Sequence, residues 1–436
     1  MATLLMVESW VNSTGRSLPP LLRNLGHDYV LLTRDPDLYP PSPSGTPHPV
    51  VAGADEVVIV ETNDVDAAGD AAADVARRRR IDGVLTTCDY YLGTAATLAE
   101  RLGLPGAPPT VVHGATRKHL VRAALDRAGL PNPAFAVAAT WTGATTAAAR
   151  LGTPLVAKPV DLNAGTSVRL VTDEGDLKDA FWDVRGREHN TRGQPLQRLL
   201  LLEQVLTGVE VSVEAVTVDG RTTVVGITDK SVAGPPAFVE SGHMFPAQLD
   251  RRVAASVEAF VVDALAAIGF THGVSHTEVM VTSDGPRLVE INPRQGGGHI
   301  FDLVHLVTGT NTLEATVDLA LGNQPRLGRA EAPLPAATVP GGSAAVFFVM
   351  SPRPGRVERV TGLDRAAGDP RVLTCTLPTP VEAPRPLDNE AYLGRIVTVD
   401  PAGGRARAHA EEVVGALRLH FADGTSCPPL GIPSGL

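Results

Sequence analysis

The stretch from His276 to Gly298, HTEVMVTSDGPRLVEINPRQGGG, constrains the fold of this chain more than any other part of the sequence. It contains two short runs rich in β-branched residues on either side of an Asp-Gly-Pro turn, a pattern typical of a β-hairpin. With the aspartate at the middle of the turn, antiparallel pairing places Glu278 opposite Glu290 and His276 opposite Asn292. Because side chains alternate along a strand, these four side chains point to one face.

Two carboxylates directly opposite each other repel unless a cation lies between them. A hard divalent cation fits, because Glu278, Glu290 and the Asn292 carbonyl supply oxygen ligands of the kind that Mg²⁺ prefers. Arg294 follows two residues later, with a fork of donors suited to a phosphate or a developing anion. Residues 295–298, Gln-Gly-Gly-Gly, add backbone N–H groups that are unshielded at the glycines, because glycine has no side chain. The sequence therefore predicts a magnesium site beside an anion site.

An isolated match to this pattern also arises in a surface hairpin with solvated acids. The other face of the hairpin argues against that alternative, because Val279, Val281, Val289 and Ile291 are uniformly apolar. A buried apolar face places the acids together on the opposite face.

A chain of 436 residues is too long to fold around a single hydrophobic core. The length therefore predicts two to four domains. Hydrophobic residues make up 43% and charged residues 20%, as in ordinary soluble globular proteins. The formal net charge of −10 argues against nucleic acid as a main partner. The basic run Arg77 to Arg80 ends an alanine-rich helical stretch, and we interpret it as a solvated helix end.

The three cysteines, Cys88, Cys375 and Cys427, are widely separated and show no metal-binding spacing. This pattern favours a reducing cytoplasm, with Cys88 in packing rather than as a nucleophile. The chain opens with no basic-then-apolar leader, and no apolar run approaches membrane-spanning length. We expect a cytoplasmic protein that contacts no membrane.

Strands alternate with helical patterns over the first hundred residues, which predicts a doubly wound parallel sheet. The expected strands are residues 3–7, 29–33, 56–61 and 83–87. The first crossover carries Ser13-Thr14-Gly15-Arg16 in place of G-x-G-x-x-G, so we do not expect a dinucleotide site there. Glycines and prolines between residues 103 and 109 predict a domain boundary near residue 115.

Two lysines stand out in the next part of the chain. Lys118 lies in the first turn of an expected helix over residues 117–128, where the helix dipole disfavours a cation. A solvated lysine and a contact to an anionic ligand both remain open for it. Lys158 lies inside a short apolar strand, where a lysine needs a partner. The small-residue loop 161–167 follows, and it could fold over a phosphate chain.

Residues 199–204 are expected to form an apolar strand with Glu203 near its end. Asp219-Gly220 predicts a hairpin after residues 209–218, in which apolar and polar residues alternate. Residues 230–246 are expected to form a Gly- and Pro-rich loop, either solvated or a lid over a site, with the first slightly favoured. Polar residues 183–198 are expected to be an exposed irregular excursion. Further expectations are helices over 252–268, 313–321 and 408–417, a linker over 322–340, short strands from 344 onward and a loose tail from 428.

In their order along the chain, these elements resemble the ATP-grasp fold, in which two α+β lobes close over ATP. The resemblance covers about residues 115 to 325, and the flanking regions resemble the domains of L-amino acid ligases. It implies three parts: an N-terminal doubly wound α/β domain, a two-lobed ATP-grasp domain and a small C-terminal α+β domain. The expected bounds are 1–115, 116–325 (lobes about 116–200 and 201–325) and 326–436.

The resemblance implies that Lys118 and Lys158 contact the ATP phosphates beneath the loop 161–167. That loop holds one glycine, Gly165, fewer than many relatives have. The segment Glu203-Gln-Val-Leu206-x-x-x-Glu210 matches the adenosine site of the family. The expected ATP-binding residues are Lys118, Lys158, Ser167, Glu203, Gln204, Leu206 and Glu210, with Leu206 on the adenine ring and Glu210 on the ribose hydroxyls.

The same resemblance makes Glu278, Glu290 and Asn292 ligands of magnesium, with two Mg²⁺ ions expected and Mn²⁺ as a substitute. Arg294 is expected to be catalytic by steadying an acyl phosphate and its tetrahedral successor, together with the amide of Gly297. The pattern E-x-x-H-x-x-P at Glu240 and His243 resembles the amino-acid-binding loop of dipeptide-forming L-amino acid ligases.

These expectations combine into an ATP-dependent ligase that converts a carboxylate to an acyl phosphate and passes it to an amine. One rival keeps the fold and uses bicarbonate or formate, and another is a non-catalytic ATP-binding regulatory protein. An intact set of metal ligands with Arg294 weighs against the second rival. The expected partners are small-molecule carboxylates and amines, and the resemblance implies a homodimer.

Overall fold

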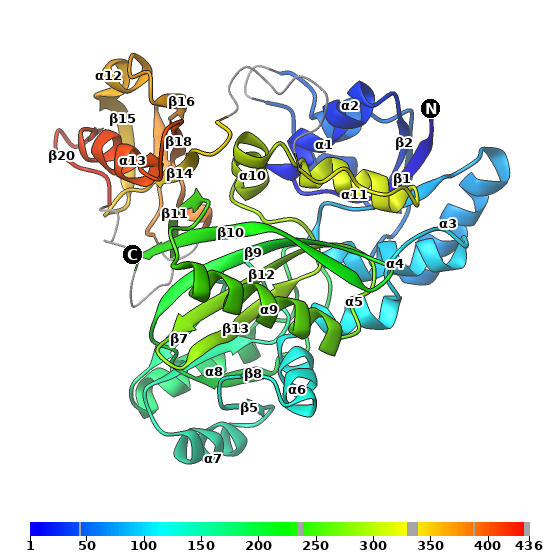
Figure 1. Ribbon diagram of the computed structural model, residues 1–436, viewed down its shortest axis with the longest axis horizontal. Helices are drawn as coiled ribbons and strands as arrows, with labels where there is room; N and C mark the ends of the chain where they lie inside the picture. The colour runs from blue at the N-terminus through cyan, green and yellow to red at the C-terminus, as the bar shows by residue number, and fades with distance from the viewer. Residues whose placement is uncertain (43–44, 234–238, 329–338, 387–388, 431–436) are drawn as a thin grey trace.

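The computed structural model describes residues 1–42, 45–233, 239–328, 339–386 and 389–430. Figure 1 shows an N-terminal block (blue), a central body that spans the middle and bottom of the view, and a C-terminal block (orange to red) set apart from the N-terminal one. Within the described ranges, no helix is long and apolar enough to cross a membrane.

The N-terminal block is a parallel sheet in the order β3-β2-β1-β4, with helices on both faces. One core lies between the sheet and helices α3 and α4, and a second lies between the sheet and helices α1 and α11. The predicted doubly wound sheet is therefore confirmed. Its elements are β1 (Thr3–Val7), α1 (Thr14–Asn24), β2 (Asp28–Thr33), η1 (Pro36–Leu38), α2 (Pro49–Ala52), β3 (Glu56–Ile59), α3 (Val65–Arg78), β4 (Gly83–Leu85), η2 (Asp89–Tyr91), α4 (Leu92–Arg101) and α5 (Pro109–Ala115).

The first lobe of the central body is an antiparallel sheet in the order β5-β8-β6-β7, covered by helices α7 and α8. Its elements are α6 (Lys118–Ala128), β5 (Phe135–Ala138), α7 (Trp141–Leu151), β6 (Leu155–Pro159), β7 (Arg169–Val171), α8 (Glu174–Gly186) and β8 (Leu200–Gln204). The predicted strand lysine, Lys158, lies in β6 and is buried.

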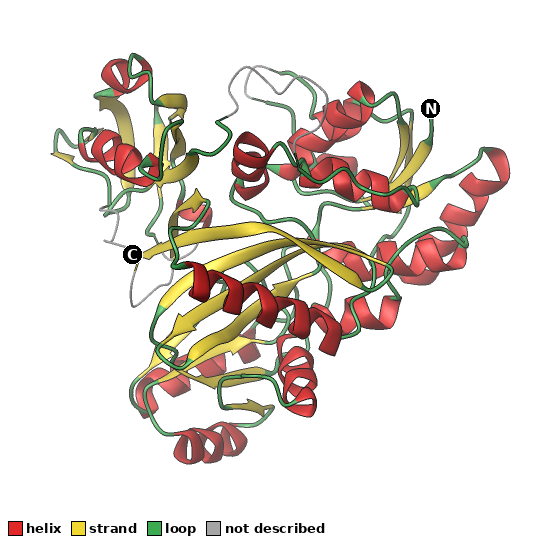
Figure 2. Ribbon diagram, in the orientation of Figure 1, coloured by secondary structure: helices red, strands yellow, loops and turns green. Residues whose placement is uncertain are grey.

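The second lobe is built on long antiparallel strands that cross the middle of the molecule (Figure 2). Its elements are β9 (Val209–Val218), β10 (Arg221–Ala233), β11 (Val239–Phe245), α9 (Arg251–Ala267), β12 (Gly273–Thr282), β13 (Gly285–Asn292), α10 (Ile300–Thr308) and α11 (Thr312–Ala320). Helix α9 presents an apolar stripe, including Phe260 and Leu265, to one face of this sheet. That packing seals one face and leaves the polar side chains of the strands on the other.

The C-terminal block continues the sheet of the second lobe, because β14 pairs with β11 in an eight-stranded order β13-β12-β9-β10-β11-β14-β18-β16. A smaller sheet, β17-β15-β19-β20, and helix α13 complete the block. Its elements are β14 (Ser343–Val349), β15 (Gly355–Thr361), α12 (Leu363–Ala367), β16 (Val372–Thr376), β17 (Val381–Ala383), η3 (Asn389–Ala391), β18 (Gly394–Asp400), α13 (Ala406–Gly415), β19 (Arg418–Phe421) and β20 (Ser426–Cys427). Part of the predicted linker and of the predicted tail lies outside the described residues.

The hairpin β12–β13 has the predicted register at its polar positions: Glu278 faces Glu290, and His276 faces Asn292. A register shift next to Glu278 changes the apolar face, because Val279 pairs with Leu288. Leu288 is fully buried, whereas Val289 is not part of the core. The prediction that Val289 lines the apolar face is thus wrong, since a bulge adds one residue and reverses the alternation.

The prediction of a loop over residues 230–246 is also wrong. Strand β10 continues to Ala233, and β11 begins again at Val239 and pairs with both β10 and β14. Glycine and proline are concentrated between these strands, at residues 234–236, which lie outside the described residues. Pairing on both edges fixes the flanking residues in the sheet despite the turn-like composition.

The predicted excursion over residues 183–198 is neither fully irregular nor fully exposed. Helix α8 runs to Gly186, and Arg192 is buried against the N-terminal block. The Arg192 guanidinium donates to the backbone carbonyl of Ser9 at 2.6 Å and lies over the rings of Trp10 and Tyr39. Contacts between distant parts of the chain therefore order a segment whose local composition predicts a loop.

Candidate active site

Neighbouring strands of the second lobe carry polar side chains at paired positions on the face opposite helix α9. Glu278 on β12 is paired with Ser212 on β9 and with Glu290 on β13. One step along the same strand, His276 is paired with Glu214 and Asn292. Because paired residues of adjacent strands share a face, the sheet assembles a row of ionisable groups that are distant in sequence.

Lys230 on β10 is the centre of this row. Its side chain is 2% exposed, and its Nζ lies 2.6 Å from Glu278, 2.8 Å from Glu240 and 3.2 Å from Glu210. Burial lowers the pKa of Lys230, but the three carboxylates outweigh burial and raise it well above its ordinary value. Lys230 therefore stays positively charged and offsets the repulsion among three acids that the sequence assigned to ribose, substrate and metal.

His276 adds a second cation to the same row. Its Nδ1 lies 2.7 Å from Glu214, and its Nε2 lies 3.3 Å from Glu278. Burial lowers the pKa of His276, yet Glu214 and Glu278 raise it to about 9. The pKa of Glu278 is correspondingly held well below its ordinary value, because Lys230 and His276 outweigh the effect of burial. Glu278 is thus ionised at neutral pH.

Glu290 is neutralised from the first lobe, where Lys118 Nζ lies 2.9 Å from its carboxylate. The same ammonium donates to the backbone carbonyl of Leu162 at 2.6 Å, at the start of the loop 161–167. Among the described residues, no group of three or more His, Cys, Asp or Glu could hold a metal ion. The oxygens of Glu278, Glu290 and Asn292 fit a hard cation that takes its remaining ligands from water and phosphate.

A buried ion-pair cluster joins the two lobes behind this row. The Glu203 carboxylate, 4% exposed at the end of β8, accepts from Arg122 at 2.6 and 3.2 Å and lies 2.7 Å from Lys158. Arg122 also donates to the carbonyl of Val289 at 2.8 Å. Burial raises the pKa of Glu203, but Arg122 and Lys158 outweigh it and lower the pKa to about 2. Glu203 thus holds Lys158 in place, and Gln204 and Leu206 follow at the surface of the connection to β9.

The loop 161–167 has the backbone geometry of a small cradle. Ala164, Gly165 and Ser167 all have positive φ, at 56°, 70° and 60°. Two of these are not glycine, and left-handed backbone is unfavourable for such residues, so the loop is strained. The buried hydroxyl oxygen of Ser167 has no hydrogen-bond partner among the described residues. A donor without a partner in a strained loop is consistent with the predicted contact to phosphate.

Arg294 is held by a carboxylate of the N-terminal block. Its Nη2 donates to Asp89 at 3.0 Å, its Nε also bonds to Asp89, and its Nη1 donates to the carbonyl of Gln295 at 2.7 Å. The other neighbour of Asp89 is Asn163 of the loop 161–167, which donates to it at 3.0 Å. Asp89 follows β4, at the carboxyl edge of a parallel sheet, where ligand sites of such sheets lie. The Asp89 carboxylate therefore connects the N-terminal block, the loop 161–167 and the predicted catalytic arginine.

Glu240 and His243 lie in β11, so they occupy a strand and not the loop that the sequence predicted. His243 is fully buried, and neither ring nitrogen makes a hydrogen bond to a described residue, although Nε2 lies 3.4 Å from Glu240. Gly298 lies directly against the ring, because a Cβ there would come within 2.6 Å of His243 Nε2. Gly297 has open space around its Cα. A buried imidazole that makes no hydrogen bond to a described residue, beside a glycine and a carboxylate, can bind a polar group of a substrate.

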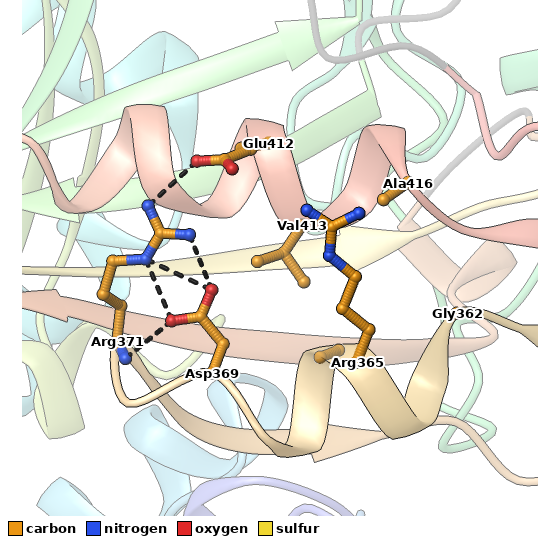
Figure 3. A pocket seen from close by; sticks show the side chains of 8 residues that line it. Gly362, Arg365, Asp369, Arg371, Glu412, Val413 and Ala416 are labelled. Atoms are coloured by element: carbon orange, nitrogen blue, oxygen red, sulfur yellow. Dashed lines mark hydrogen bonds and ion pairs between the residues drawn. The ribbon is translucent and has the colours of Figure 1, made fainter.

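A small cavity in the C-terminal block is no rival site. Figure 3 shows Arg371 bonded to Asp369 and Glu412 at its edge, with Arg365 and Val413 beside them. The cavity encloses about 20 Å³. That volume holds a single water and no substrate.

Most predicted site residues take part in ion pairs of this region. They are Glu278, Glu290, Lys118, Lys158, Glu203, Glu210, Glu240 and Arg294, and Asn292 is paired in the sheet with His276. Four partners were missed as site residues: Arg122, Lys230, Asp89 and Glu214. Lys230 was missed because residues 230–246 were expected to form a loop, whereas β10 runs to Ala233 and places this lysine inside a strand. Asp89 carried no signal, since its partners are 205 and 74 residues away in sequence.

Three protein families match this chain, in the order in which its blocks occur. An ATP-grasp N-terminal domain matches residues 23–106, an ATP-grasp domain matches residues 151–302, and L-amino acid ligase C-terminal domain 2 matches residues 347–422. The matched ATP-grasp region contains Lys158, Glu203, Lys230, Glu278 and Arg294.

Individual proteins and a solved structure are also similar to this chain. An uncharacterized protein of Sinorhizobium fredii is 27% identical over 95% of this chain and 82% of its own length. Carnosine synthase 1 of Gallus gallus is 33% identical over 59% of this chain, which spans 29% of that enzyme. The crystal structure of an L-amino acid ligase from Bacillus licheniformis superimposes with a TM-score of 0.77 at 23% identity, covering 97% of this chain and 99% of the ligase.

Proposed function

We propose that the chain joins a carboxylate to the amine of an amino acid, with ATP converted to ADP and phosphate, because its ATP-grasp and L-amino acid ligase C-terminal domain matches occur in this order along the sequence. The observation that carries the proposal is the convergence of Glu278, Glu290, Lys118 and Arg294 on the space between the two lobes and the N-terminal block. Carboxylates for a metal, a cation for phosphate and a guanidinium for an anion are the groups that phosphoryl and acyl transfer require.

In the proposed reaction, a carboxylate oxygen of the acid substrate attacks the γ-phosphorus of ATP. The new P–O bond forms as the bond to the β-phosphate oxygen breaks, which yields an acyl phosphate and ADP. The amine nitrogen then attacks the acyl carbon, the bond to the phosphate oxygen breaks, and the nitrogen loses its proton to water. Phosphate and an amide are released, and no protein nucleophile takes part.

The chain's own residues act by position and charge. Lys118 and Lys158 would offset the triphosphate beneath the loop 161–167, and the hydroxyl of Ser167 would donate to it. Glu203, Gln204 and Leu206 would contact adenine, and Glu210 the ribose. Glu278, Glu290 and Asn292 would hold Mg²⁺, the ion that ATP-grasp enzymes generally use with ATP, and two ions are expected. Bound Mg²⁺ would supply charge neutralisation at the phosphates.

Arg294 would stabilise the anion that develops at the acyl carbon, assisted by the amide of Gly297. For this role it must exchange part of its contact with Asp89 for the new anion. Glu240 and His243 would bind the acid substrate, because a buried imidazole with free nitrogens and a carboxylate match an amino acid's ammonium and polar groups.

The test is phosphate release from ATP and Mg²⁺ across a matrix of amino acids and other carboxylates paired with amines, with product masses recorded. Release that requires both partners, together with a condensed product, supports the ligase. The Glu290→Gln variant serves as the background control in every well. Release that requires bicarbonate or formate in place of an amine would replace this proposal with the rival reaction, and tight ATP binding without release would favour a regulatory protein.

The homodimer and the cytoplasmic location also remain proposals. Light scattering of the purified chain tests the first, and fractionation of expressing cells tests the second.

A further inference from the structure

A cavity of about 550 Å³ lies where the N-terminal block, the first lobe and the end of strand β13 meet. Its walls come from η2, α4, α5, the loop after β6 and the segment around residues 190–196. The volume falls within the range of roughly 300–1,000 Å³ that is usual for small-molecule sites.

The cavity adjoins the predicted phosphate and metal groups, because Asp161 and Asn163 of the loop 161–167 line it. Asp89, Glu290 and Asn292 line it, and these residues contact Arg294 or belong to the predicted metal site. The described residues that line it include none of the predicted adenosine contacts, and neither Glu240 nor His243. It therefore extends from the predicted phosphate and metal groups into a space outside the predicted adenosine and acid-substrate contacts.

The carboxylates in its wall are already bonded. Asp89 accepts from Arg294 and Asn163, and Glu290 is paired with Lys118. Asp161 accepts from the backbone N–H of Gln197 at 2.8 Å.

Arg117 differs from these groups. Among the described lining residues it is the one arginine or lysine, and it has no carboxylate within ion-pair distance in the described part of the chain. Its Nη1 donates to the carbonyl and hydroxyl oxygens of the adjacent Thr116 at 3.2 and 3.4 Å, and its buried Nε has no partner. His113 of α5 lies on the same wall, and burial and Arg117 lower its pKa, so it adds no charge at neutral pH.

We propose that this cavity binds the amine substrate, and that this substrate is an amino acid whose free carboxylate pairs with Arg117. The inference rests on the proposed ligase activity. An amino acid that acts through its amine keeps its carboxylate throughout the reaction, so its site needs a cation that no protein acid already neutralises. A guanidinium with an unused donor is suited to a planar carboxylate, and the cavity also reaches Asp89 and Glu290, which contact Arg294 and Lys118 of the proposed reaction centre.

The test compares the wild-type chain with Arg117→Ala, Arg117→Lys and the control Arg127→Ala. Arg127 lies in helix α6, whose N-cap is Arg117; it is exposed and is not among the residues that line the cavity. Each protein is assayed with the acceptor amino acid found in the substrate matrix and with its carboxamide, which lacks the charge. The KM values for ATP and for the acid substrate are measured in parallel.

A charged hydrogen-bonded pair is worth roughly 10-fold to 100-fold in binding. Arg117→Ala should therefore raise the KM of the acceptor amino acid by about that factor and change the KM of its carboxamide by less than about two-fold. Arg117→Lys should restore part of the preference, and Arg127→Ala should resemble wild type. The KM for ATP should stay within about two-fold. If Arg117→Ala does not fold, the comparison of carboxylate and carboxamide in wild type and in Arg117→Lys carries the test.

An unchanged preference for the carboxylate in the variants would overturn the acceptor site. A rise in the KM for ATP with the preference intact would also overturn it and assign Arg117 to the phosphates. Wild-type protein without any amine-dependent turnover would instead overturn the proposed ligase, so the two failures are distinguishable.

Discussion

Replacing Glu203 by Gln should destabilise the first lobe strongly, although the two side chains have nearly the same shape. Glu203 is the shared counter-ion of Arg122 and Lys158, which are 1% and 5% exposed. The variant leaves two buried cations without an anion, and breaking a buried pair in this way costs about 3–5 kcal/mol.

The pKa of Glu203 gives a second route to the same magnitude. It is about 2 in the folded chain against an ordinary value of 4.5, and each pKa difference of one corresponds to about 1.4 kcal/mol. The ionised carboxylate therefore contributes about 3 kcal/mol to the free energy of unfolding. Because the folded pKa is the lower one, this stability is present above about pH 4.5 and is lost as the pH falls toward 2.

The assay follows urea unfolding of the lobe by tryptophan fluorescence. The chain has three tryptophans, and Trp141 and Trp182 lie in helices α7 and α8 of this lobe. A Trp10→Phe background leaves these two as reporters. Asp179→Asn, an exposed acid on α8, serves as the control.

We expect Glu203→Gln to lower the free energy of unfolding by about 3 kcal/mol at pH 7, with a difference from the parent that shrinks below about pH 4.5. A difference below about 1 kcal/mol at pH 7 would refute the reasoning, and so would a difference that stays constant down to pH 3. The subtraction removes the contribution of other acids, which titrate in both proteins.

Three further changes test the site. Glu290→Gln should reduce turnover by at least roughly 10²-fold while nucleotide affinity, measured by equilibrium binding, changes little; full activity would refute the metal assignment. Lys230→Met leaves three partly buried acids without their shared buried cation and should cost roughly 2–4 kcal/mol of stability, measured by chemical unfolding, whereas Lys230→Arg should recover most of it; equal stability of the two variants would contradict the shared role. Asp89→Asn removes the charge that holds Arg294 and should lower kcat roughly 10-fold to 100-fold with the KM for ATP unchanged, and an unaltered kcat would show that Arg294 needs no such support.

Local sequence patterns predicted the elements that carry the site. Alternation around an Asp-Gly turn was sufficient to pair Glu278 with Glu290, and strand–helix alternation predicted the parallel N-terminal sheet. A lysine inside an apolar strand predicted a buried partner for Lys158, which the structure supplies as Glu203. These features depend on residues close in sequence, where strand and helix periodicities operate directly.

Local patterns failed where pairing partners are remote. Residues 230–246 have the composition of a loop, yet β10 and β11 form because β9 and β14 supply hydrogen-bonding edges. The bulge puts Leu288 in place of Val289 in the core that includes α9, and strict alternation along the strand does not predict it. Composition indicates the conformation that a segment prefers in isolation. Pairing with the edge of an existing sheet can make the same segment a strand.

The sequence by itself determined the chemical groups of this protein: the paired glutamates, the strand lysine, the arginine after the hairpin and the glycines beside it. Tertiary structure alone decided which groups face one another, including Lys230 among three acids, Asp89 on Arg294, and Arg117 in a cavity without a carboxylate partner among the described residues. The physical reason is that charge interactions depend on distance in space, and residues up to 205 positions apart become neighbours only when the sheets and blocks have assembled.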